Sequence, residues 1–151
     1  MPTPLHSTAA FPACDGLALV VARGAGQGRG GPDDALDIGL ELAGTIGERE
    51  AGGDQVRVVV LRMGRREESA WVREAMQWLA ERGRRVLVRT SVRLSRDLEQ
   101  IARRYGATIM LELAHSKPAV QTALLGGDAE PAAALLLHAQ HLRRIGLEVA
   151  V

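Results

Sequence analysis

Short apolar runs rich in valine, leucine and isoleucine alternate with amphipathic segments along this chain, and this alternation restricts the fold more than any other feature. The apolar runs lie at Leu17–Ala22, Val56–Leu61, Val86–Val88, Thr108–Leu113 and Leu147–Val151. Such runs are typical of strands in a parallel sheet that is covered on both faces. Parallel strands that follow one another in the sequence need crossover connections, which are usually helices.

The intervals between the apolar runs have the spacing of amphipathic helices. These helices are expected from Pro32 to Gly52, from Ser69 to Gly83, from Ser95 to Gly106 and from Ala132 to Gly146. Serine caps a helix start well and glycine commonly follows its last turn, so both ends of the two middle segments carry the expected signals. The sequence therefore predicts an α/β fold of four strand–helix units plus a fifth strand. Its parallel sheet is either partial TIM-barrel-like or open and doubly wound.

The chain is expected to form one domain, residues 14–151, after a flexible leader, residues 1–13. With 151 residues, 46% of them hydrophobic, it can bury a core, and with 3% aromatics that core must be aliphatic. The net charge of +1 gives no reason to expect a nucleic acid or an anionic membrane as partner. We expect a cytoplasmic location, because no secretory signal and no apolar run of about 20 residues is present.

Polar residues follow the predicted strands at their carboxyl ends, where ligands bind in parallel α/β folds. These residues are Arg23, Arg62, Arg89, Glu112 and His115. Three guanidinium groups at one rim suit an anionic or nucleotide-like ligand, because guanidinium binds phosphate and carboxylate in a bidentate way. The alternative is that Arg89 and Glu112, on consecutive strands, pair with each other.

Two further motifs have a structural and a functional interpretation. Gly26, Gly28 and Gly31 match the spacing of a dinucleotide-binding loop, but the match is weak in a chain with 17 glycines, and we favour a flexible loop over a cofactor-binding one. His138 and His141 have a spacing that allows a shared metal ion on one helix, but the sequence shows no third ligand, so we predict no metal site.

The order of segments resembles the N-terminal half of radical S-adenosylmethionine (SAM) enzymes, especially those that modify peptides. The matching stretches are CDGLALVVARG (Cys14–Gly24), VRVVVLRMG (Val56–Gly64), WVREAMQWLAERGRRVLVRTS (Trp71–Ser91), ATIMLELAHSKP (Ala107–Pro118) and HLRRIGLEVAV (His141–Val151). The resemblance implies a half-barrel fold that covers most of the chain from Cys14 onward.

The functional motifs of that family are replaced in this chain. Cys14 is the only cysteine, and Ala18 and Val21 stand where the second and third cysteines of the Cys-x3-Cys-x2-Cys motif belong. The Gly-Gly-Glu-Pro site reads Arg62-Met63-Gly64-Arg65, the Thr-Asn-Gly site reads Thr90-Ser91-Val92, and the Ser-Leu-Asp site reads Glu112-Leu113-Ala114. One thiolate cannot hold a four-iron cluster, so we expect neither an iron–sulfur cluster nor SAM, and no catalytic residues.

Two functions follow as expectations. The first is a non-catalytic, radical-SAM-like scaffold that acts through a second copy of itself or through a protein or peptide partner, as an accessory to a peptide-modifying system. The second is a small-molecule binding protein or enzyme that uses the strand-end arginines on an anionic ligand.

Overall fold

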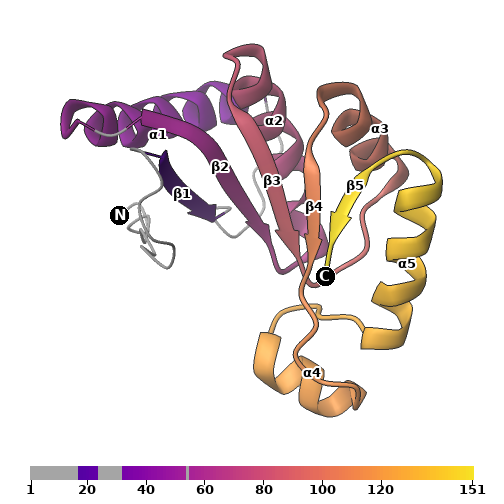
Figure 1. Cartoon of the computed structure of the whole chain (residues 1–151). Coiled ribbons are helices and arrows are strands. Elements are labelled where there is room, and N and C mark those ends of the chain that lie inside the picture. Colours follow the sequence, from indigo (N-terminus) through magenta and orange to yellow (C-terminus); the bar gives the residue numbers. More distant parts are fainter. Residues whose placement is uncertain (1–16, 24–31, 54) are drawn as a thin grey trace.

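Five parallel strands lie side by side in chain order, β1-β2-β3-β4-β5 (Figure 1). The computed structural model describes residues 17–23, 32–53 and 55–151. The strands are β1 (Leu17–Arg23), β2 (Gln55–Met63), β3 (Arg85–Thr90), β4 (Thr108–Leu111) and β5 (Glu148–Ala150). The predicted α/β fold with a parallel sheet is confirmed. A doubly wound sheet requires a reversal in its strand order, and this order contains none. It is the order in which successive strands follow one another in a βα barrel.

Four helices cover one face of the sheet. They are α1 (Pro32–Ala51), α2 (Ser69–Glu81), α3 (Arg96–Tyr105) and α5 (Ala132–Arg144). Helix α2 packs against both α1 and α3, and all four helices contribute buried side chains to one aliphatic core. None of the described helices is both long and apolar enough to cross a lipid bilayer.

Alternation along the strands sends neighbouring side chains to opposite faces. On β2, Val59, Leu61 and Met63 enter the core beneath the helices. The other face carries the half-exposed Val58 and Leu87, and no helix in the described part of the chain packs on it. The sequence predicted strands covered on both faces, whereas the described helices cover one.

Of the two serines predicted to cap helices, one does so in the structure and the other does not. The Ser95 hydroxyl caps α3 as predicted, accepting a hydrogen bond from the Leu98 amide at 3.2 Å, and Gly106 ends that helix in the left-handed conformation. Ser69 is not a cap but the first residue of α2, because the short 3-10 helix η1 (Arg66–Glu68) leads directly into it.

The sequence analysis missed helix α4 (Pro118–Leu125), which lies beyond the carboxyl ends of the strands (Figure 1). A proline at its first position is a valid helix start, but its eight residues are too short for a clear periodicity. The segment between α4 and α5, residues 126–131, then returns across the strand ends. We call it the return segment.

The return segment makes backbone contact with the loop after β2. The amide of Asp128 donates to the carbonyl of Gly64 at 3.1 Å, and the Asp128 carboxylate accepts from the Arg66 amide at 3.1 Å. Gly127 allows this approach: its φ is +59°, and a Cβ there would lie 2.5 Å from the Gly64 carbonyl oxygen.

Replacing Gly127 with alanine is therefore expected to destabilise the fold by about 2 to 4 kcal/mol, because strain and a backbone clash combine. Gly106→Ala is the matched control: φ there is also positive, at +65°, but no atom lies within 4 Å of the new Cβ. It should cost only about 1 to 2 kcal/mol. Urea unfolding followed by circular dichroism measures both. Equal losses in the two variants would contradict the close approach.

Candidate functional site

A cavity of about 390 Å³ opens at the carboxyl ends of β2 and β3, between these strands and helices α2, α3 and α5. Its lining combines cationic, anionic and apolar side chains: Met63, Arg66, Ser69, Arg93, Leu94, Ser95, Glu99 and His138. The volume lies at the lower end of the range for small-molecule sites, which is about 300 to 1,000 Å³. Its position at the strand ends is the one where parallel α/β folds bind ligands.

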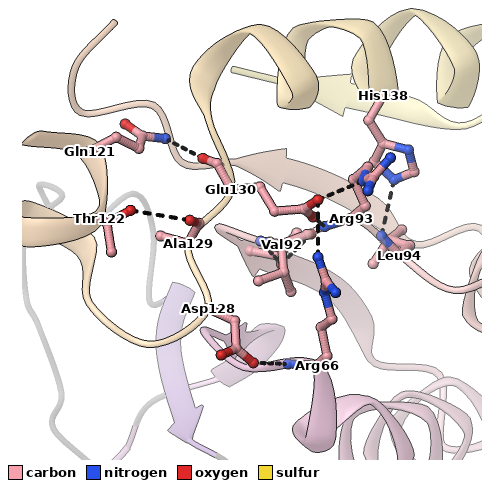
Figure 2. A network of polar contacts seen from close by, with 11 residues as sticks. Arg66, Val92, Arg93, Leu94, Gln121, Thr122, Asp128, Ala129, Glu130 and His138 are labelled. Carbon is pink, nitrogen blue, oxygen red and sulfur yellow. Dashed lines mark hydrogen bonds and ion pairs between the residues drawn. The ribbon is translucent and has the colours of Figure 1, made fainter. Parts of the chain in front are cut away.

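A buried carboxylate organises the cationic side of this cavity (Figure 2). The side chain of Glu130 is 6% exposed, and its Oε1 accepts from Nε of Arg93 at 2.6 Å and pairs with Arg66 at 3.3 Å. Its Oε2 accepts from the backbone amide of Arg93. A carboxylate removed from water needs this degree of pairing, since an unpaired buried charge is strongly destabilising.

The loop between β3 and α3, residues 91–95, is held by hydrogen bonds with Glu130 and His138. The Glu130 amide donates to the Ser91 carbonyl at 2.9 Å, and the Leu94 amide donates to Nε2 of His138 at 3.0 Å (Figure 2). These bonds join the loop to the return segment and to α5. The position of Arg93 in the cavity wall therefore depends on residues about 40 positions later in the chain.

His138 is held in one tautomer by this contact. Because Nε2 accepts from the Leu94 amide, the proton of the neutral ring lies on Nδ1. Burial lowers the pKa of His138 and outweighs the nearby Glu99 carboxylate, which raises it. While Nε2 accepts from the Leu94 amide, the ring is neutral and adds no charge to the cavity.

Helix α3 adds a carboxylate to the lining of the cavity. Glu99, on the first turns of α3, is buried, and its Oε2 lies 3.1 Å from Nε2 of His141. The rings of His138 and His141 stack with centroids 5.9 Å apart. Across the described residues there is no group of three or more His, Cys, Asp or Glu side chains placed to hold a metal ion.

The side chain of Gln121 on α4 binds the backbone on both sides of it. Its Oε1 accepts from the amides of Ala114 and His115 at 2.8 and 2.9 Å, and its Nε2 donates to the carbonyls of Glu112 and Glu130. The amide group is fully buried and fully satisfied, as a buried polar group must be. It joins the end of β4 to the return segment.

The predicted strand-end cluster forms on the other face of the sheet. Arg62 and Arg89 are register partners on β2 and β3, and Oε1 of Glu112 lies between them, 3.8 Å from Arg62 and in direct contact with Arg89. Neither oxygen of Glu112 has an aligned hydrogen bond, so these contacts are electrostatic. Two guanidinium groups directly opposite each other repel, and the carboxylate offsets that repulsion. The pairing of Arg89 with Glu112 is therefore real.

Of the remaining predicted residues, only His115 has a described side chain, and it does not join this cluster. Arg23 is the register partner of Arg62 on β1, but its side chain lies outside the described residues. His115 is exposed, and its Nδ1 accepts from the Lys117 amide at 3.0 Å within a local turn. The leader with Cys14 and the loop with Gly26, Gly28 and Gly31 lie outside the described residues.

Sequence reasoning missed the residues that build the cavity. Arg66, Arg93 and Glu130 lie in loops or short helical turns, where a charged residue normally needs no explanation. One signal was present: Glu130 directly precedes Pro131 at the start of a helix, in a stretch otherwise made of small and apolar residues. No pattern in the sequence connects it with Arg93.

Comparison of the chain with protein-family models, with curated protein sequences and with solved structures gave no match.

Protonation of His138 is expected to cost stability as the pH falls. An unfolded histidine titrates near about pH 6.5, and burial lowers the folded-state pKa of His138 below its usual value. The unfolded state then binds the proton first. The free energy of unfolding should therefore decrease below about pH 6.5 until the folded-state pKa is passed. Urea unfolding between roughly pH 5 and pH 8 measures this dependence.

The His138→Gln variant should lose less stability than the wild type over that interval, because its side chain does not titrate. His115→Gln is the matched control, since His115 is an exposed histidine in a local turn. It should keep the wild-type pH dependence. An unchanged pH dependence in His138→Gln would contradict the assignment.

Proposed function

We propose that this chain binds a small ligand through an anionic group held by Arg66 and Arg93 at the cavity beneath the strand ends. The observation that carries the proposal is the shared buried partner of the two arginines. Glu130 orients both guanidinium groups, while their side chains stay 65% and 56% exposed. Each guanidinium has five N–H donors, and the contacts with Glu130 use only some of them.

Two helices support the same choice of ligand group. Ser69 begins α2 and Ser95 caps α3, and both residues line the cavity. The amino ends of helices carry partial positive charge and free backbone amides. The Ser69 amide already donates to the Arg66 carbonyl and the Leu98 amide to the Ser95 hydroxyl. The two helix ends therefore add partial positive charge, and the two guanidinium groups supply the donors for a phosphate or a carboxylate.

The Arg62–Glu112–Arg89 cluster supports the proposal less well. The side chains of Arg62 and Arg89 are 28% and 48% exposed, less than those of Arg66 and Arg93, and neither of them lines the cavity. Met63 lines the cavity, and its neighbour Arg62 points to the opposite face, so the two clusters do not form one site.

The test is ligand-induced thermal stabilisation with inorganic phosphate, ethyl phosphate and succinate as probes. A ligand present at 100 times its Kd adds about 2.7 kcal/mol of stability, which raises the Tm of a chain of this size by roughly 5 °C or more. The double variant Arg66→Gln, Arg93→Gln should abolish that shift, because it removes both guanidinium groups but keeps the backbone amide that Glu130 binds.

Arg85→Gln is the matched control. Arg85 is an exposed arginine at the opposite end of β3, paired with Glu148 at 3.6 Å. This variant should keep the wild-type shift. If none of the three probes stabilises the wild type, or if the double variant responds as the wild type does, the proposed anion site is wrong.

A second candidate function is the radical-SAM-like scaffold that acts through protein contacts. Two observations favour it: the strand order is that of successive barrel units, and the face opposite the helices exposes apolar side chains. Val58, Leu87 and Met110 are each partly exposed on that face, whereas Val60 on the same face is 6% exposed. Exposed apolar surface of this kind is often covered by a partner, and we infer a second copy of the chain as the simplest one.

Sedimentation equilibrium tests this inference. The wild type should form a dimer, and Leu87→Glu should shift it to the monomer, because a charge on the contact face opposes its burial. Leu137→Glu is the control, since Leu137 is 67% exposed on α5, on the helix side of the sheet. A monomeric wild type, or a dimer that Leu87→Glu leaves intact, would contradict a contact through this face.

A further inference from the structure

The charges around the cavity balance to zero. Arg66 and Arg93 contribute two positive charges, and Glu99 and Glu130 contribute two negative ones. The imidazole of His138 is neutral, as its hydrogen bond with Leu94 requires. A ligand with a large net negative charge would therefore have to lie close to two buried carboxylates. The balance favours a ligand whose own charges also cancel or nearly cancel.

The charged groups also come from different elements of the fold. The two arginines come from η1 and from the loop after β3, where Glu130 holds them, whereas Glu99 comes from α3 and faces the same cavity. Met63 and Leu94 supply apolar lining. A short ligand with opposite charges at its two ends and a hydrocarbon link between them matches this division.

The carboxylate of Glu99 can accept a further hydrogen bond from a ligand. Its contact with His141 engages one of its two oxygens, and that contact fixes the direction of the carboxylate. A carboxylate has about four acceptor positions, so capacity for a ligand remains. The group is also largely withdrawn from water, with its side chain 11% exposed, and a charge-assisted hydrogen bond is stronger in such surroundings.

We propose that the ligand is a zwitterion, whose phosphate or carboxylate lies between Arg66 and Arg93 and whose ammonium group is bound by Glu99. The chemical class is that of aminoalkyl phosphates and amino acids. This inference rests on the proposed anion site and adds a second recognition element to it. Glu99 is then the residue that separates zwitterions from simple anions.

The experiment compares 2-aminoethyl phosphate with ethyl phosphate, two probes that differ in the terminal ammonium group. Kd values are measured by calorimetry at about pH 8, where histidine side chains of ordinary acidity are uncharged. The wild type should bind 2-aminoethyl phosphate at least about tenfold more tightly, which corresponds to one charge-assisted hydrogen bond. Glu99→Gln should reduce that preference to less than about threefold: it should weaken the binding of 2-aminoethyl phosphate and should not weaken that of ethyl phosphate, for which a repulsive carboxylate is removed.

Glu81→Gln is the matched control, because the Glu81 carboxylate contacts only Gln77 on the exposed surface of α2. It should keep the wild-type preference. The comparison of the two probes on the wild type needs no variant. It therefore tests the zwitterion inference even if Glu99→Gln folds poorly. Equal binding of the two probes would overturn the zwitterion inference and leave the anion site standing. Failure of both probes to bind would overturn the anion site itself.

Discussion

The rest of the cavity depends on the contacts that the buried carboxylate of Glu130 makes. It binds the backbone amide and the side chain of Arg93, pairs with Arg66, and belongs to a residue whose own amide holds Ser91 (Figure 2). A charge in this position costs several kcal/mol if its partners are lost. The loops after β2 and β3 and the return segment must therefore be in place together, so the cavity wall forms cooperatively with the end of the fold.

This dependence explains the role of the short helix α4. Gln121 joins the end of β4 to the carbonyl of Glu130, and Gly127 lets the return segment lie against Gly64. Neither residue contributes to the main aliphatic core. Both act on the backbone geometry of the strand ends, where the polar groups have no sheet partners of their own and must find hydrogen bonds elsewhere.

The sequence predicted what depends on local periodicity and missed what depends on long-range pairing. The strands, the helix after Ser95 and its stop at Gly106 follow from spacing and capping within a few residues. The predicted pairing of Arg89 with Glu112 is confirmed as well, because both side chains lie on one face of the sheet at the ends of adjacent strands, where Met110 is the register partner of Arg89. The contact between Arg93 and Glu130 spans 37 positions and involves two irregular segments, and no periodic pattern reports such a contact.

The two faces of β2 show why recognition is expected on the helix side of the strand ends. Both Arg62 and Arg66 belong to clusters in which one buried glutamate serves two arginines. At Glu112 the arginines are neighbours in the sheet, and their carboxylate relieves a repulsion that the strand pairing itself creates. At Glu130 the arginines come from separate loops, so no strand pairing forces them together. The buried Glu130 needs both as partners, and both also line a cavity that contains Glu99, which is the arrangement that the proposed ligand of mixed charge would use.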